Sequence, residues 1–224
     1  MKNRITQVVF LLFFGWMMVY GITSSSGKSG KTGAPGENTC VQCHAGVINS
    51  NGGSVTISGI SNNSYQPGQV YTLSVTVTDA ASSLFGFSAV ALQASGANAG
   101  TLVAGTDNHT ESLNVGGFLR NYVTHNTDGG ATAGSHTFVF SWTAPATDIG
   151  NVTIYVTANA ADGNGGTTGD HIYSTSLTLS PQQIGGGEVV INEVDCDQAG
   201  PDAQEFVELY GTPNMSLNGY SIVF

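Results

Sequence analysis

The sequence predicts an all-β fold, an antiparallel β-sandwich, on three observations. Short runs in which apolar residues alternate with Thr or Ser recur along the chain, which is the period of a half-buried strand. Clusters rich in Gly and Asn separate these runs and predict turns. After residue 22, no stretch of ten or more residues shows a helical period. Charged residues make up only 9% and apolar residues 40%, which favours an extracellular β domain with a real core.

The first element, residues 1–22, is predicted to be a secretion signal. Lys2 and Arg4 precede an apolar run over residues 8–20, and small residues follow. The run is shorter than the roughly 20 residues that a spanning helix needs, so cleavage is expected, with an uncleaved anchor as the alternative. Residues 23–38 are rich in Gly and Ser and are expected to form a flexible linker.

The main domain is expected over residues 39–181. Its predicted strands are 53–60, 70–79, 85–94, 100–106, 137–145, 151–160 and 171–180. The clearest alternation is in 70–79, where Leu73, Val75 and Val77 are separated by Ser and Thr. Another strand is expected to give way to a turn at His125, after Tyr122 and Val123.

The chain changes character after Pro181. Residues 182–188 (QQIGGGE) are expected to be a linker, and seven of the fifteen acidic residues lie between Glu188 and Glu208. Residues 189–224 are too few to bury a core of their own, so we expect the start of a second β domain. An edge appendage of the first sandwich is the alternative.

The charge of the chain argues against two kinds of partner. The formal net charge is −10, and only five residues are Lys or Arg, two of them in the predicted signal. Nucleic acids and anionic membrane surfaces need clustered cations, so neither is an expected partner. Stable membrane insertion is not expected once the signal is removed.

The motif Cys40-x-x-Cys43-His44 predicts covalent haem c, one per chain. Two thiols at this spacing can reach the two vinyl groups of one porphyrin, and the adjacent imidazole can then ligate the iron. Three alternatives remain open: a Cys40–Cys43 disulfide in the oxidising compartment that export implies, a share in a zinc site, and a redox pair of the thioredoxin type.

The second iron ligand stays open at this point. All four methionines lie in the predicted signal or the C-terminal stretch (Met1, Met17, Met18 and Met215), so a methionine ligand is not expected. The alternatives are another histidine, a weak ligand such as Lys31, or an open position. The candidate histidines are His109 (expected in a polar loop), His125, His136 and His171.

Several segments together resemble a known family. They are TGAPGENTCVQCHAG, YQPGQVYTLSVTV, FGFSAVAL, YVTHNT and FSWTAP, and over about residues 33–180 they resemble the choice-of-anchor V domain of exported Bacteroidetes-type proteins. That domain is similar to the reelin-type (reeler) sandwich. The resemblance implies secretion to the cell surface or periplasm, haem c on Cys40, Cys43 and His44, and His125 as the second metal ligand. It implies no enzymatic activity.

The C-terminal segment VVINEVDCDQAGPDAQEFVELY resembles the start of a lamin-tail domain, an immunoglobulin-like sandwich. Cys196 stands there where an aromatic residue is more usual. Our working hypothesis is therefore an exported, surface-associated sandwich that uses haem c for electron transfer or sensing, with a redox partner or surface assembly. The alternatives are a non-catalytic adhesion or matrix module with a Cys40–Cys43 disulfide, and an oxidase or peroxidase, which needs an open iron site.

Overall fold

The computed structural model describes residues 26–127, 130–182, 189–195 and 206–211, with Leu217 and Ser221. The chain divides into two compact units, Met1–Pro181 and Gln182–Phe224. The predicted signal, residues 1–22, lies outside the described residues, so it stays a prediction. Within the described parts of the chain, no helix is both long and apolar enough to cross a membrane.

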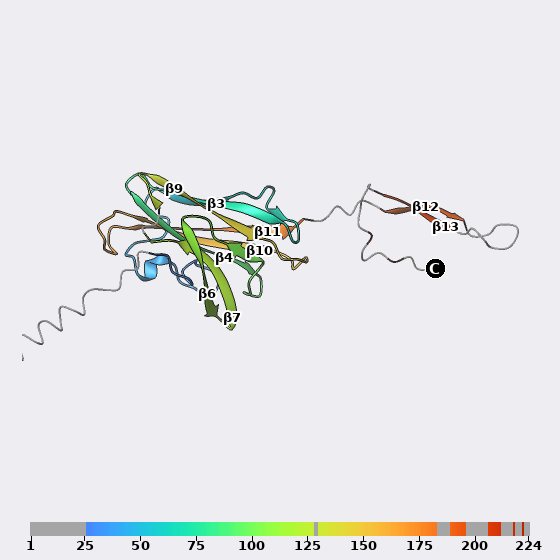
Figure 1. Ribbon diagram of the computed structural model, residues 1–224, viewed down its shortest axis with the longest axis horizontal. Coiled ribbons are helices and arrows are strands. Elements are labelled where there is room, and N and C mark those ends of the chain that lie inside the picture. Colours follow the sequence, from blue (N-terminus) through green and yellow to red (C-terminus); the bar gives the residue numbers. More distant parts are fainter. Residues whose placement is uncertain are drawn as a thin grey trace, which may run out of the picture. The chain divides into compact units, whose positions relative to one another are not determined.

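The first unit is a β-sandwich, which confirms the predicted fold class (Figure 1). The smaller sheet has the order β1 (Ser54–Ser58), β3 (Val70–Thr78), β9 (Ser135–Thr143), β5 (Thr101–Val103). The larger sheet has the order β2 (Ser64–Tyr65), β11 (His171–Pro181), β10 (Val152–Ala161), β4 (Leu84–Gln93), β7 (Phe118–His125), β6 (Asn108–Val115), and β8 (Gly130–Ala131) also pairs with β4. The pairing of β2 with β11 is parallel, and the other pairings in both sheets are antiparallel.

The core lies between the two sheets, where the alternating residues of the predicted strands meet. Phe138 of β9 is fully buried, and its ring stacks on that of Phe87 of β4, with the ring centroids 4.4 Å apart. Trp142 is also fully buried, and its indole Nε1 donates to the carbonyl of Ala99 at 2.8 Å. The long strands β3, β4, β9 and β10 each give one row of apolar side chains to this core, which is what the period of two predicts.

The other face of the larger sheet is covered by residues 26–46, which we call the N-terminal segment. Ala34 of this segment is 2% exposed and packs with Val90, Leu92 and Tyr122. The flexible linker predicted over residues 23–38 is therefore wrong for residues 26–38, which are packed. The reason is a set of side-chain contacts, described below, that composition cannot show.

Two local expectations also need correction. His109 lies on the edge strand β6 and not in a loop, because residues 108–115 pair with β7 as a hairpin. An edge strand can be polar along most of its length, so the alternation that marks a half-buried strand is missing there. The strand expected over 100–106 is shorter, since β5 spans Thr101–Val103.

The second unit is described only in part. Strands β12 (Val190–Asp195) and β13 (Phe206–Tyr210) pair antiparallel. Cys196 lies outside the described residues. The linker over 182–188 and the lamin-tail resemblance stay predictions.

Candidate functional site

The Cys-x-x-Cys-His motif forms one tight turn. Residues Cys40–Gln42 are a 3-10 helix, η1, and the backbone N–H groups of Cys43 and His44 both donate to the carbonyl of Cys40, at 3.1 and 2.9 Å. In a 3-10 turn, side chains at positions i and i+3 lie above one another, so Cys40 and Cys43 share one side of the turn. Both are free thiols, so the alternative Cys40–Cys43 disulfide is not formed in this structure.

The two thiols differ in environment. Cys43 is exposed, whereas Cys40 is partly buried, and burial of its sulfur raises its pKa to about 12. Cys40 is therefore a neutral thiol at physiological pH, which disfavours a nucleophilic role. A thioether sulfur carries no charge, so the same burial is compatible with covalent attachment of a porphyrin.

His44 is held by a buried carboxylate. Its Nδ1 lies 2.5 Å from Oδ2 of Asp170, whose side chain is 2% exposed while that of His44 is 29% exposed. Burial works against ionisation of Asp170, but hydrogen bonds from His44 and Asn159 outweigh it and lower the pKa of that carboxyl below its ordinary value. An ionised carboxylate can only accept, so Nδ1 of His44 is the donor in this bond. In the neutral imidazole, Nε2 is then the nitrogen that carries the lone pair.

Local structure places Asp170 at this point. It is the last residue of a glycine-rich loop before β11. Within that loop the side chains of Asp162 and Asn164 accept backbone N–H groups two residues on, which is the geometry of Asx turns. The backbone N–H of Ala45 donates to the carbonyl of Thr167 at 2.8 Å, so the motif is tied to the same loop.

His125 is the last residue of β7, which pairs with β4, and its ring lies over Gly86 of β4. Its Nδ1 is 3.0 Å from the backbone N of Phe87 and 3.2 Å from the carbonyl oxygen of Phe87. A Cβ on Gly86 would come within 2.5 Å of the His125 ring, so glycine is required there. Gly86 pairs with Asn159 of β10, and Asn159 also contacts His44, which brings the two histidines to neighbouring places.

The pKa of His125 also reflects its position near His44. Burial lowers the pKa of His125, and the backbone hydrogen bond from Phe87 opposes that shift. Coulombic repulsion from His109 and His44, in their protonated forms, lowers it further. His125 is therefore neutral at physiological pH, which is the form that ligates metals.

The other predicted candidates for the second iron ligand form hydrogen bonds with residues outside the motif or, for Lys31, with Gln42 inside it. Both ring nitrogens of His109 are hydrogen bonded, to Asn126 and to Glu111 and Thr124. Both ring nitrogens of His136 are hydrogen bonded too, to Thr132 and Asp107. His171 binds Asp79, which follows β3 of the opposite sheet, and Lys31 donates to Gln42.

Buried polar atoms around the motif lack partners. Among the described residues, three buried side-chain atoms have no hydrogen bond: Oγ1 of Thr39, Oγ of Ser88 and Oδ1 of Asn159. Thr39 precedes the motif, Asn159 contacts His44, and Ser88 lies on the covered face of the larger sheet. Buried polar atoms without partners are rare in folded proteins, so their gathering here fits a site that takes a further group.

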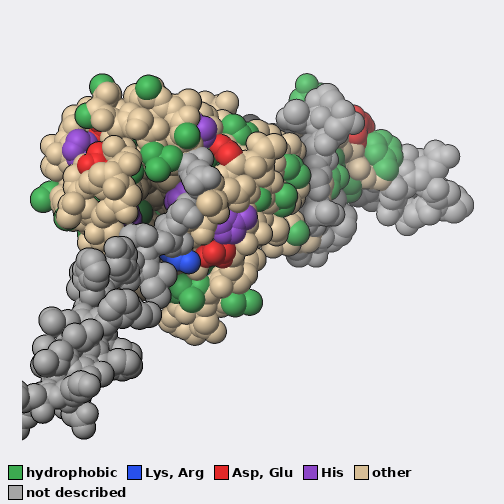
Figure 2. Space-filling model, turned by 60° about the vertical axis from the view of Figure 1, so that its left-hand side comes forward, with side chains coloured by type: hydrophobic (Ala, Val, Ile, Leu, Met, Phe, Trp, Pro, Cys, Tyr) green, Lys and Arg blue, Asp and Glu red, His purple; other side chains and the backbone are tan. Residues whose placement is uncertain are grey.

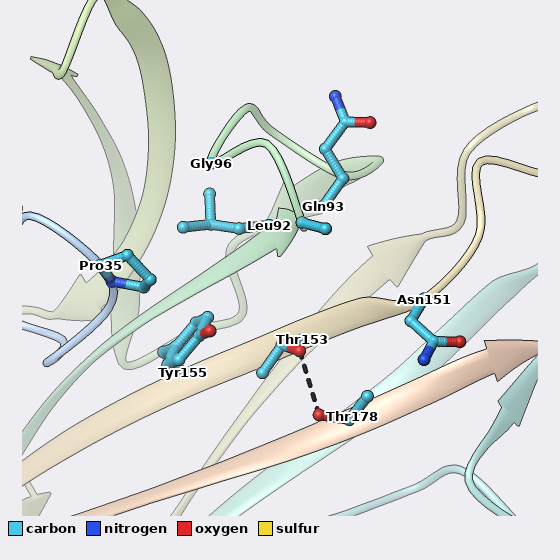
Figure 3. Close-up of a pocket in the computed structure, with 9 residues that line it drawn as sticks. Pro35, Leu92, Gln93, Gly96, Asn151, Thr153, Tyr155 and Thr178 are labelled. Atoms are coloured by element: carbon cyan, nitrogen blue, oxygen red, sulfur yellow. Dashed lines mark hydrogen bonds between the residues drawn. The ribbon is translucent and has the colours of Figure 1, made fainter.

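A hollow of about 180 Å³ lies on the same face of the larger sheet, beside Pro35 (Figure 3). Leu92 and Tyr155 form its apolar part, and Thr153 and Thr178 are hydrogen bonded to each other at 3.0 Å in its polar part. Its lining contains no His or Cys, so it is separate from the candidate site. On the face drawn in Figure 2, histidine and charged side chains gather in small groups within a mostly uncharged surface.

Part of this chain is similar to several solved structures at low sequence identity. No family model matches the chain, and no curated protein matches it. The human F-spondin reeler domain is 22% identical, with a TM-score of 0.39, over 58% of this chain and 88% of that domain. A cohesin module of a Clostridium perfringens family 33 glycoside hydrolase is 13% identical, with a TM-score of 0.41, over 58% and 96% of the two chains.

The structure thus brings Cys40, Cys43, His44 and His125 to one end of the larger sheet. Sequence reasoning missed Asp170, Asn159 and Gly86, which hold the two histidines. Asp170 stands directly before His171 in the sequence, but nothing in that dipeptide indicates that His44 is its partner.

Proposed function

We propose that this chain is an exported, surface-associated protein whose β-sandwich carries one covalent haem c and transfers single electrons. The observation that carries the proposal is His44. Its Nδ1 is fixed on buried Asp170 and its Nε2 is left free, directly beside two unpaired cysteines. A histidine that gives its other nitrogen to a carboxylate is the usual arrangement of a metal-ligating imidazole.

Cys40 and Cys43 are the two residues that would hold the porphyrin covalently. Each S–H would add across one vinyl group, so that sulfur bonds to one carbon and the hydrogen goes to the other, with no external oxidant or reductant. Cys40 enters this reaction as a neutral thiol in a desolvated place. Bound haem c supplies a one-electron couple at the iron.

His125 is the proposed second ligand. Its Nδ1 faces both the N–H and the carbonyl of Phe87, so the ring is satisfied with its proton on either nitrogen. Nε2 can therefore give up its proton to Nδ1 and act as the ligand. Two histidine ligands would leave no open position for a small molecule, which favours electron transfer over an oxidase or peroxidase.

The test is expression of the chain with a cytochrome c maturation system, followed by a haemochrome spectrum after denaturation. The wild-type chain should keep haem through denaturation, and the variant Cys40→Ser/Cys43→Ser should lose it. If neither protein holds covalent haem, the proposed function is wrong.

The same preparation tests the second ligand. His125→Ala should shift the Soret band, whereas His136→Ala, a histidine with both nitrogens already bonded, should not. Equal spectra for wild type and His125→Ala would refute the assignment of His125.

A further inference from the structure

We infer that Asp170 is a positioning residue that strengthens His44 as an iron ligand and so lowers the reduction potential of the haem. This inference rests on the proposed function. It deepens that function, because it states which kind of electron donor the protein can accept.

The geometry supports a strong interaction. Nδ1 of His44 is hydrogen bonded to Oδ2 of Asp170, whose side chain is 2% exposed. Hydrogen bonds to an ionised carboxylate are stronger than those between two neutral groups. Water therefore does little to weaken the interaction between the carboxylate and the imidazole.

The remaining contacts of Asp170 hold it in place without neutralising it. Asn159 Nδ2 donates to Oδ2 at 3.3 Å, and the backbone N–H of Asp162 donates to Oδ1 at 3.4 Å. Both donors are uncharged, and no Lys or Arg pairs with Asp170 among the described residues. The negative charge is therefore directed at the imidazole of His44.

A carboxylate at Nδ1 increases electron donation from Nε2 to a bound metal. Greater donation stabilises the ferric state more than the ferrous state. The iron is then harder to reduce, so the electron donor must be a low-potential carrier. A haem with His44 alone, without Asp170, would accept electrons from weaker reductants.

The structure offers a matched control. His171 Nδ1 lies 2.5 Å from Oδ2 of Asp79, whose side chain is 3% exposed. This second pair has the same chemistry and similar burial, and its histidine lies next to Asp170 in the chain, but its carboxylate contacts His171 and Tyr173 and not the motif. Asp79→Asn therefore reports the general effect of removing a buried carboxylate from a histidine.

The experiment is spectroelectrochemical titration of the haem-loaded full chain. Asp170→Asn should raise the midpoint potential, and a tenfold loss of ferric stabilisation corresponds to about 59 mV for one electron. Asp170→Glu, which keeps the charge, should restore part of the difference, and Asp79→Asn should leave the potential at the wild-type value. An Asp170→Asn potential equal to that of wild type, or a shift matched by Asp79→Asn, would overturn the inference.

A second readout does not need the haem. In the haem-free variant Cys40→Ser/Cys43→Ser, ¹⁵N NMR should show a protonated, downfield-shifted Nδ1–H on His44, and Asp170→Asn should remove that shift. A wild-type chain that takes up no haem would end both proposals. Haem uptake with no Asp170 effect on either the potential or the His44 signal would end only this one.

Discussion

At the scale of single residues, the candidate site depends on two buried polar side chains, those of Asp170 and His125. Asp170 accepts hydrogen bonds from His44, Asn159 and the backbone of Asp162, and His125 is hydrogen bonded to the backbone of Phe87. Removing either partner leaves a buried polar group unsatisfied, which costs about 1–3 kcal/mol. Single substitutions here should therefore have large and specific effects.

Acid is expected to destabilise the fold through His125. Burial lowers the pKa of His125 in the folded state, so the unfolded chain takes up the proton first, near the ordinary value of about 6.5. The contribution of His125 is complete above about pH 6.5 and is lost as the pH falls from there through the lower folded pKa.

Urea denaturation of haem-free protein at about pH 7.5 and about pH 5 measures this effect. The variant His125→Gln should lose less stability than wild type between the two conditions, because glutamine does not titrate. The same pH dependence in both proteins would show that another group is responsible.

At the scale of elements, the main feature is the attachment of the N-terminal segment to the larger sheet. Glu37 of the segment accepts hydrogen bonds from Arg120 Nη1 at 2.6 Å, from Tyr122 OH at 2.6 Å and from Thr32 Oγ1 at 2.7 Å. The side chains of Arg120 and Glu37 are 4% and 1% exposed. Arg120 also donates to the carbonyls of Pro35 and Gly96, so one ion pair fixes the segment that carries the cysteines.

Glu37→Ala should release this segment. The substitution leaves the Arg120 charge buried without a partner, which costs about 3–5 kcal/mol. Hydrogen exchange should therefore become faster over residues 26–46 while β9 and β10 keep their protection.

Two comparisons sharpen that experiment. Lys31→Ala, at the surface of the same segment, should change stability by no more than about 0.5 kcal/mol. The double variant Glu37→Leu/Arg120→Met, which removes both charges, should recover much of the loss. Unchanged exchange in Glu37→Ala would mean that apolar packing of Ala34 holds the segment instead.

At the scale of the whole molecule, one continuous core joins the two sheets of the first unit. Phe138 and Phe140 of the smaller sheet meet Phe87 of the larger sheet, with ring centroids 4.4 and 5.8 Å from that of Phe87. Because both sheets place residues in this core, β1, β3, β5 and β9 on one side and β2, β4, β7, β10 and β11 on the other, we expect the sandwich to unfold as a unit.

Phe138→Ala should lower the free energy of unfolding of the whole sandwich by about 3–5 kcal/mol, because it leaves a cavity between the sheets. Thr72→Ala, at an exposed position on β3 in the same sheet, should cost less than about 1 kcal/mol. Chemical denaturation followed by tryptophan fluorescence measures both, and equal effects would contradict the role given to Phe138.

The sequence by itself determined the local features: the strands whose apolar residues alternate, the turns between them, and the Cys40, Cys43 and His44 motif. These depend on residues close together in the chain, so their spacing predicts them. His125 was favoured by the family resemblance, and the structure brings it near His44. The tertiary structure alone decided that residues 26–38 are packed, that Asp170 holds His44, and that Gly86 makes room for His125. These contacts join residues far apart in the chain, and only the pairing of strands brings them within hydrogen-bond distance.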